Sequence, residues 1–302
     1  MKDAGVLIGL LASTAFGLGA CGPASAKTLN AVASFTVLAD VVKQVGGDHV
    51  NVKSLVGPNG DPHEFEPSPD DAKTLKEADI TFVSGEGLES WFEKLVTASG
   101  YSGKPIVASK GIKTRTMEED GKTVTDPHVW NSPVSVEVWV ANIEKALISA
   151  DPDDAAAFKA NAAQYTKELR DLHTYAKSVL ETVPKDKRKI LTSHYAFGYF
   201  DREYGVEFLS PVGLSTETEA SAADVAKLID QIKTEKVKTY FFENSNDSRL
   251  VDQISKATGA EPGGELYVES LSKADGPAPT YAKMFRYNVD QISKAIAGSS
   301  DF

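Results

Sequence analysis

Residues 151–179 have the sequence DPDDAAAFKANAAQYTKELRDLHTYAKSV, and the apolar pattern within them determines the fold. Apolar side chains recur at alternating spacings of four and three residues, which is typical of one buried face on an α-helix. Asp151 and Pro152 supply the cap and the proline that favour a helix start here. We therefore predict a single helix of about 30 residues, about 45 Å long at a rise of about 1.5 Å per residue. The apolar positions are Phe158, Ala162, Tyr165, Leu169, Leu172, Ala176 and Val179.

The segments on either side of this helix alternate between short apolar runs and amphipathic stretches. This alternation predicts βα units and parallel sheets. The predicted fold class is α/β, with two lobes that are each a mostly parallel sheet with covering helices, joined by one long rigid helix. A coiled coil with a second chain is the alternative use of that helix, but its apolar face is short and rich in alanine. The predicted domains are an N-terminal lobe at residues 27–150, the linking helix at residues 151–185 and a C-terminal lobe at residues 186–302. The predicted strands are residues 29–34, 52–56, 80–84, 106–108, 189–193, 206–209, 237–243 and 265–268.

The first 26 residues have the features of an export signal. An apolar run from Ala4 to Leu18 is too short to span a bilayer as a stable helix. The small residues of Ala24-Ser25-Ala26 form an ordinary cleavage site, so we predict a signal peptide at residues 1–26. The alternative is a lipoprotein signal, because Leu18-Gly19-Ala20-Cys21 resembles a lipobox and would leave a lipid anchor at Cys21. Both alternatives place the mature protein in the periplasm.

Charge and cysteine content narrow the class of protein further. The formal net charge of −11 argues against a nucleic-acid partner. Cys21 is the only cysteine, so the exported domain forms no internal disulfide and offers no thiolate to a metal or to catalysis. We expect the mature protein to be a monomer that is stabilised by its apolar core.

Three of the five histidines occur in contexts that predict a shared site. The phrase Asp-Pro-His occurs twice, ending at His63 and at His128, and His194 follows a predicted strand. Neutral imidazole is the commonest protein ligand for borderline divalent metals. Ligands of parallel α/β sheets collect beyond the carboxyl ends of the strands, which is where His194 and Glu269 lie. We predict a metal centre in the cleft between the lobes, with His63 and His128 from one lobe and His194 and Glu269 from the other.

Each of these residues also has an ordinary structural explanation. His63 and His128 are also compatible with turns hydrogen-bonded to the adjacent backbone, although the repeated phrase disfavours this, and His194 is also compatible with an ordinary helix start. Glu269 is the weakest member, because acids in loops are usually solvated. Glu243 and Asp247, which follow the neighbouring strand, are alternative carboxylate ligands.

We predict supporting roles for two acids near the centre and ordinary structural roles for the two remaining histidines. We predict that Glu66 and Asp126 hold imidazoles through the ring nitrogen that does not face the metal, although either is also compatible with a solvated loop charge. His49 and His173 are expected to be ordinary structural histidines outside the centre.

Four phrases of the chain resemble those of the zinc/manganese-type substrate-binding proteins of bacterial ABC importers, called cluster A-I or cluster 9. The resemblance implies two α/β lobes joined by a long helix, with a metal ion between them. It places the four ligand positions of the family at His63, His128, His194 and Glu269. It also implies an inner-membrane ABC permease with its ATPase as the partner, and no enzymatic activity. The phrases are Gly60-Asp61-Pro62-His63-Glu64-Phe65-Glu66-Pro67, Gly87-Leu88-Glu89-Ser90-Trp91, Asp126-Pro127-His128-Val129-Trp130 and Ser193-His194-Tyr195-Ala196-Phe197-Gly198-Tyr199-Phe200.

The chain departs from the family pattern in two places. The last ligand position is usually aspartate, whereas Glu269 is one methylene longer. Zinc members often carry a histidine-rich loop before the second ligand, whereas residues 116–122 contain acids and no histidine. Three nitrogens and one carboxylate suit Zn²⁺, while Mn²⁺ prefers more oxygen and binds nitrogen-rich sites less tightly. We therefore expect Zn²⁺ as the transported ion, with Mn²⁺ as the alternative.

Two other functions are compatible with the same residues. Three histidines with an open fourth position also form the catalytic zinc arrangement of hydrolases. The sequence contains no His-Glu-x-x-His helix, and no serine–histidine–acid set stands out in it. A cell-surface adhesion lipoprotein is the second alternative, and it rests only on the lipobox at Cys21.

Overall fold

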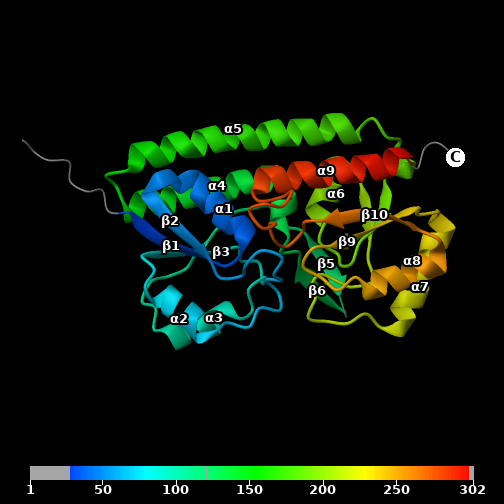
Figure 1. The fold of residues 1–302 in the computed structure, drawn as a ribbon, viewed down its shortest axis with the longest axis horizontal. Coiled ribbons are helices and arrows are strands. Elements are labelled where there is room, and N and C mark those ends of the chain that lie inside the picture. Colours follow the sequence, from blue (N-terminus) through cyan, green and yellow to red (C-terminus); the bar gives the residue numbers. More distant parts are fainter. Residues whose placement is uncertain (1–27, 120, 299–302) are drawn as a thin grey trace, which may run out of the picture.

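The computed structural model of the chain describes residues 28–119 and 121–298. The predicted signal peptide, with Cys21 and both cleavage signals, lies outside the described residues. Within the described ranges, no helix combines the length and the apolar content that crossing a membrane requires. Figure 1 shows two α/β lobes side by side, with a layer of long helices along one side of both.

The N-terminal lobe is a parallel four-stranded sheet with the strand order β2-β1-β3-β4. Its central strands are short apolar runs, and the β1 and β3 positions are almost all buried. The capping box of Ser68 and Asp71 starts α2, and proline occupies its first position. The strands are β1 (Leu29–Ala33), β2 (Val50–Ser54), β3 (Ile80–Val83) and β4 (Ile106–Val107), and the helices are α1 (Thr36–Gly46), α2 (Pro69–Lys76) and α3 (Phe92–Ser99).

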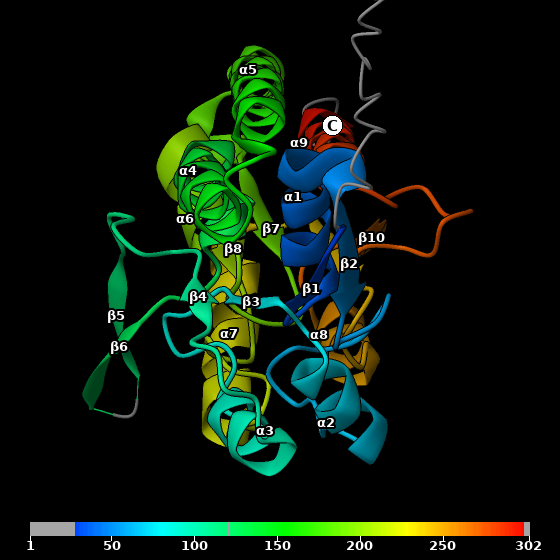
Figure 2. The same cartoon turned by 90° about the vertical axis from the view of Figure 1, so that its left-hand side faces the viewer.

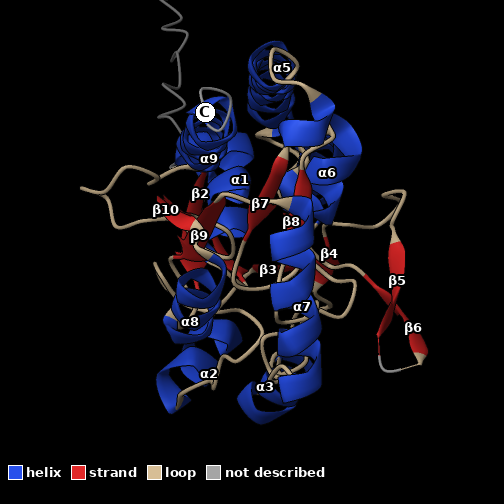
Figure 3. Cartoon of the chain, turned by 90° about the vertical axis from the view of Figure 1, so that its right-hand side faces the viewer, coloured by secondary structure: helices blue, strands red, loops and turns tan. Residues whose placement is uncertain are grey.

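The C-terminal lobe repeats this architecture with the strand order β10-β9-β7-β8, again parallel. Counted from the first strand of each lobe, both sheets have the order second, first, third, fourth. Helices α7 and α8 lie on the side of this sheet that is remote from the long helices (Figures 1 and 3). The strands are β7 (Lys189–Leu191), β8 (Glu207–Leu209), β9 (Thr239–Glu243) and β10 (Glu261–Leu266), and the helices are α6 (Gly198–Tyr204), α7 (Ala222–Glu235) and α8 (Arg249–Thr258).

Three long helices form the layer that joins the lobes: α4 (Pro133–Ala150), α5 (Ala155–Leu180) and α9 (Tyr281–Gly298). Helix α5 has 26 residues and runs past both lobes (Figure 1). Its buried residues follow the predicted spacing, except that Leu180 rather than Val179 is the last buried residue. Helix α9 lies beside α5 and also packs on β10. The predicted fold class is confirmed, with two parallel sheets flanked by helices.

Most of the buried apolar side chains form one main core that passes through both lobes and the helical layer. A second cluster, here called the outer core, lies between the C-terminal sheet and helices α7 and α8. It is much smaller than the main core and consists of Leu191, Leu209, Leu228, Ile232, Val237, Val251 and Ile254. The two faces of the C-terminal sheet are therefore unequally buried.

The largest departure from the sequence prediction is an antiparallel hairpin where a loop was expected. Strands β5 (Thr116–Glu119) and β6 (Lys122–Thr125) form it, and it projects from the body of the molecule (Figure 2). The last strand also differs, since β10 ends at Leu266 and leaves Val268 outside the ladder. Its segment Pro262-Gly263-Gly264 has weak strand propensity, and pairing with β9 through a bulge makes it a strand. The remaining elements are the 3₁₀ helices η1 (Gly47–His49), η2 (Val129–Asn131) and η3 (Lys185–Lys187).

Candidate metal centre

The four predicted ligand side chains converge between the two lobes. One potential ligand atom from each of His63, His128, His194 and Glu269 lies within 4.8 Å of the others. All four residues are buried, and His128 and Glu269 are completely inaccessible. The structure therefore brings together all four candidates, two from each lobe.

The three imidazoles meet through their Nε2 atoms. The Nε2 of His128 lies 3.2 Å from the Nε2 of His63 and 3.3 Å from that of His194. Glu269 Oε1 lies 3.2 Å from His128 Nε2 and 3.1 Å from His194 Nε2. Its other oxygen, Oε2, is buried and has no hydrogen-bond partner in the described structure. Four electron-pair donors that face one another at these distances, one of them with a free buried oxygen, have the chemistry of a cation site.

Each Asp-Pro-His phrase folds into a turn that fixes the backbone of its histidine. The carboxylate of Asp61 accepts a hydrogen bond from the backbone N–H of His63 at 2.8 Å, and Asp126 does the same for His128 at 3.0 Å. This is the bond of an aspartate to the backbone two residues later, and the intervening proline restricts the backbone dihedral angles. The repeated phrase thus encodes the same local geometry twice.

Two of the imidazoles also contact a carboxylate through Nδ1, the ring nitrogen that faces away from the centre. Asp126 Oδ1 lies 2.8 Å from His128 Nδ1, and Asp126 Oδ2 accepts a hydrogen bond from Arg115 at 3.3 Å. Glu243 Oε2 binds His194 Nδ1 at 2.5 Å, and its Oε1 accepts the backbone N–H of His194 at 3.1 Å. Such a bond fixes the ring orientation and leaves Nε2 free to bind a metal. The role predicted for Asp126 agrees with this geometry.

The other candidate acids do not reach the centre. Glu243 holds an imidazole instead of offering a ligand oxygen, and Asp247 is an exposed partner of Arg249. Glu66 is exposed, and among the described residues it forms no hydrogen bond with an imidazole, so the supporting role predicted for it is wrong. His49 pairs with Asp154 at 2.7 Å and His173 contacts Tyr204, which places both outside the centre, as expected.

The charges of the centre oppose one another in the metal-free protein. Burial disfavours the carboxylate of Glu269, but the adjacent His128 and His194 outweigh this and lower its pKa. Burial likewise opposes the charged form of His128, yet Glu269 and Asp126 raise its pKa to about 9. The pKa of His194 is also raised against burial, by Glu243 and Glu269. Two of the imidazoles therefore favour a bound proton when no cation balances the carboxylates.

His63 has a different environment. Among the described residues, no carboxylate hydrogen-bonds to its ring, and burial lowers its pKa to about 3. Burial also raises the pKa of Asp61, which supports the His63 backbone, to about 6, and Glu269 adds to that increase. His63 is thus the imidazole that stays neutral without a metal.

Two cavities reach the centre from different sides. One of about 480 Å³ is lined by Asp61 and His194, and the other, of about 360 Å³, is lined by His63. The segment Leu214–Glu217 of the C-terminal lobe lines both. It also binds the N-terminal lobe, because Thr216 Oγ1 donates to Asp61 Oδ2 at 2.8 Å and Ser90 Oγ donates to Glu217 Oε1 at 3.2 Å. These two hydrogen bonds join the lobes over the centre.

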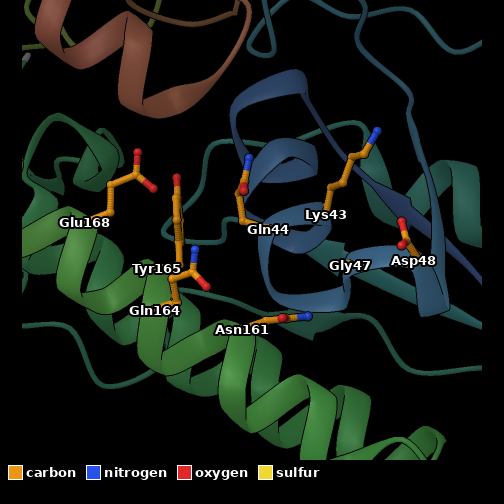
Figure 4. A pocket seen from close by; sticks show the side chains of 8 residues that line it. All are labelled: Lys43, Gln44, Gly47, Asp48, Asn161, Gln164, Tyr165 and Glu168. Carbon is orange, nitrogen blue, oxygen red and sulfur yellow. The ribbon is translucent and has the colours of Figure 1, made fainter.

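A further cavity of about 310 Å³ lies between α1 and α5 (Figure 4). None of the four converging side chains lines it. Among the described residues, His63, His128, His194 and Glu269 form the one cluster with the geometry to hold a metal ion. The cavity is therefore separate from the metal chemistry of the molecule.

Comparison with known proteins gives consistent matches along the chain. The family model ZnuA, described as zinc-uptake complex component A, periplasmic, matches residues 31–295. The manganese-binding lipoprotein MntA of Bacillus subtilis is 32% identical over 302 residues, covering 97% of this chain and 98% of that protein. The iron-binding protein YfeA of Yersinia pestis is 31% identical over 272 residues, covering 90% of this chain and 88% of that protein.

Solved structures agree with the fold described above. The periplasmic zinc-binding protein TroA of Treponema pallidum superimposes with a TM-score of 0.84 at 28% identity, covering 89% of this chain and 99% of that one. The manganese-bound periplasmic metal-binding protein of Candidatus Liberibacter asiaticus gives a TM-score of 0.80 at 30% identity, with the same coverage. The names of these relatives include zinc, manganese and iron.

Proposed function

Because this chain belongs to the ZnuA family of periplasmic metal-binding components of ABC importers, we propose that it captures Zn²⁺ and delivers it to a membrane permease driven by an ATPase. We propose that His63, His128, His194 and Glu269 are the four ligands. The observation that carries this proposal is the convergence of three Nε2 atoms and one carboxylate oxygen in a buried centre shared by both lobes.

The geometry supports zinc among the metals that the relatives are named for. A tetrahedron of ligands about 2.0 Å from its centre has edges of about 3.3 Å. Four of the six pairs of candidate ligand atoms are separated by 3.1 to 3.3 Å. The other two pairs, from His63 to His194 and from His63 to Glu269, lie within 4.8 Å, so the tetrahedron is matched along four of its edges. Three imidazole nitrogens also favour Zn²⁺ over Mn²⁺, which lies lower in the Irving–Williams order and prefers oxygen ligands.

Manganese is the second candidate because of Glu269. Its Oε2 atom has no partner, so the carboxylate has a second oxygen to offer the ion. Binding through both oxygens would give three nitrogens and two oxygens, which suits a larger and more oxygen-seeking ion than four-coordinate Zn²⁺. Manganese appears in the names of several relatives, including MntA.

The chain is a binding protein and not an enzyme, because its relatives are substrate-binding components of transporters. This excludes the zinc hydrolase that the sequence left open. The same relatives place it outside the cytoplasm, and several of them are named as lipoproteins. We propose further that residues 1–26 are its export signal, that residues 27–150 and 186–302 are its two lobes, and that residues 151–185, which contain α5 (Ala155–Leu180), link them. We also propose that it acts as a monomer. Light scattering on the purified protein tests the last point.

Substitution of single ligands tests the proposed function. We expect His63→Ala, His128→Ala, His194→Ala and Glu269→Ala each to weaken zinc binding by at least about 100-fold, because each removes one of four bonds to the ion. Isothermal titration against a zinc chelator measures the affinity, and elemental analysis of the protein as purified identifies the metal. Competition between Zn²⁺ and Mn²⁺ for the unaltered protein separates the two candidates.

The remaining histidines provide matched controls. His49→Ala and His173→Ala also remove one imidazole each, but neither ring lies at the centre. Both variants should keep the affinity of the unaltered protein. Unchanged zinc binding in all four ligand variants would refute the proposal.

A further inference from the structure

The three tryptophans of the chain each donate the indole N–H to a specific acceptor. Trp91 donates to the carbonyl oxygen of Pro62 at 2.7 Å, and Trp130 donates to that of Val268 at 2.8 Å. Trp139 donates to the hydroxyl of Ser109 at 3.0 Å. All three side chains are buried. Two of the three acceptors are therefore the peptide carbonyls directly before His63 and Glu269.

Trp130 connects the two lobes at the centre. It lies in η2, two residues after His128, and its ring packs edge-on against the His128 imidazole at a centroid distance of 5.4 Å. Its hydrogen-bond acceptor, Val268, belongs to the C-terminal lobe and precedes Glu269. One indole thus contacts the imidazole of one lobe and fixes the backbone that carries the carboxylate of the other.

The backbone before Glu269 depends on such side-chain bonds. Strand β10 ends at Leu266, so Val268 has no strand partner. The N–H of Val268 is bound by the side chain of Asn244 at 3.2 Å, and its carbonyl oxygen is bound by Trp130. Removing the indole N–H would leave this buried carbonyl without a donor and free the peptide that orients Glu269.

Trp91 has the corresponding role at His63. Within residues 28–119 and 121–298, no carboxylate hydrogen-bonds to the His63 ring, so the position of the ring depends on its backbone. Asp61 binds the N–H of His63, and Trp91 binds the carbonyl of the peptide before it. The Trp91 ring is fixed in turn against Phe65, at a centroid distance of 4.8 Å.

We infer that Trp91 and Trp130 are positioning residues of the metal centre, with Trp130 setting the distance between His128 and Glu269 across the two lobes. The inference rests on the proposed function, because it assumes that these residues bind the metal. Neither indole nitrogen is one of the four converging ligand atoms. Each orients a ligand by holding the backbone next to it, much as a carboxylate orients a metal-binding imidazole by hydrogen-bonding to its second ring nitrogen.

Replacement by phenylalanine tests this inference, because it keeps a six-membered aromatic ring and removes the indole N–H. We expect Trp130→Phe to weaken zinc binding by about 10- to 100-fold and to accelerate zinc release, which is the effect typical of losing a group that orients a ligand. We expect Trp91→Phe to weaken binding by about tenfold, because Asp61 still holds the His63 backbone. Chelator competition measures the affinity, and stopped-flow mixing with the chelator measures the release rate.

Trp139→Phe is the matched control. Trp139 is as deeply buried as Trp130 and lies 6.1 Å from it, but its N–H binds a core serine and no ligand segment. We expect this variant to lose thermal stability without its metal while keeping zinc affinity within about threefold. Equal losses of affinity in Trp139→Phe and Trp130→Phe would overturn the inference, because the loss would then be explained by the lower stability of both variants.

The visible spectrum of the Co²⁺-loaded protein supplies a readout that stability alone does not change. We expect its band positions and intensities to change in Trp130→Phe and to stay the same in Trp139→Phe, since only the former alters the geometry around the metal. If Trp130→Phe fails to fold, benzothienylalanine at position 130 keeps the bicyclic ring and lacks only the N–H. The same spectral change and loss of affinity are expected with it.

The outcomes separate this inference from the proposed function. If His194→Ala abolishes zinc binding while the position-130 variants keep the affinity, release rate and spectrum of the unaltered protein, the inference is wrong and the proposed function stands. If the histidine variants bind zinc normally, the proposed function itself is wrong.

Discussion

The two lobes share one strand order and contribute two of the proposed ligands each, yet they differ in how those side chains are supported. In the N-terminal lobe, His63 and His128 lie in loops whose backbone is fixed by Asp-Pro-His turns. In the C-terminal lobe, His194 and Glu269 lie just beyond the ends of strands and depend on Glu243, Asn244 and Trp130 for their orientation.

The lobes also differ in burial. The helices of the N-terminal lobe pack into the main core, which continues through α4, α5 and α9. Helices α7 and α8 of the C-terminal lobe rest on the separate outer core, which is much smaller. Local stability follows the amount of buried apolar contact. The N-terminal lobe is therefore the more stable support of the centre, and the outer layer of the C-terminal lobe should open at a lower free-energy cost.

We expect the greatest loss of stability from substitutions that remove volume from the main core or from the outer core. Ile143→Ala in the main core and Ile254→Ala in the outer core each delete a fully buried side chain, which costs about 2–5 kcal/mol. We expect Ile143→Ala to lower the protection of amides throughout the molecule in hydrogen exchange. Ile254→Ala should accelerate exchange in α7 and α8 and leave α1 and α4 protected.

The second prediction compares the carboxylates that support an imidazole in each lobe. Both oxygens of Asp126 and of Glu243 accept hydrogen bonds, whereas an amide has one acceptor oxygen. Asp126→Asn and Glu243→Gln are each expected to weaken zinc binding by about 10- to 100-fold in a chelator competition assay. Asp247→Asn, which changes an exposed acid, is the control. If Asp126→Asn or Glu243→Gln binds zinc as tightly as Asp247→Asn does, the supporting carboxylates of the two lobes do not have equivalent roles.

The third prediction concerns pH. Zinc binds only deprotonated imidazoles, and the pKa of His128 is raised to about 9 in the metal-free protein, after Glu269 and Asp126 overcome the effect of burial. Acidification below pH 9 therefore favours the protonated ring, and the apparent zinc affinity should fall by about tenfold per pH unit for each proton displaced. Calorimetry in buffers of different ionisation enthalpy counts the protons released. Release of no proton at pH 7 would contradict this description.

The smallest expected effect belongs to the contact between the lobes at Thr216. Thr216→Val removes the hydrogen bond to Asp61 while preserving the shape of the side chain, which costs about 0.5–1.5 kcal/mol. We expect zinc release to accelerate by less than about tenfold, with little change in thermal stability. Thr218 lines the same cavity, and its side chain forms no hydrogen bond within the described part of the chain. The zinc release rate of Thr218→Val should therefore match that of the unaltered protein.

The fold, and the convergence of the four candidate ligands, were largely predictable from the sequence, and the repeated patterns contributed most of the signal. The buried face of α5 and the two Asp-Pro-His phrases each repeat often enough to stand out from chance. The hairpin β5–β6 was missed because residues 116–122 lack apolar alternation, although Asp120-Gly121 is a common two-residue hairpin turn and was an available signal.

The roles of the supporting residues were less predictable, because they depend on tertiary contacts. Glu243 is the last residue of β9, and Glu269 follows β10 in the same sheet. The sequence predicted Glu269 as a ligand and Glu243 as the alternative, but it did not predict that Glu243 supports His194. Only the pairing of β7 with β9 shows that Glu243 lies behind His194. The bond from Trp130 to Val268 spans 138 residues and leaves no local pattern.

Helix α5 and the main core cross the boundary between the lobes, and this limits how the molecule can change shape. Swinging the lobes apart as rigid bodies would expose the apolar side chains that both share, so the overall outline should be almost the same before and after loading. Small-angle scattering would then give the same radius of gyration for both states. A pair of spin labels placed on either side of the contact between Asp61 and Thr216 would report the transition that scattering does not detect.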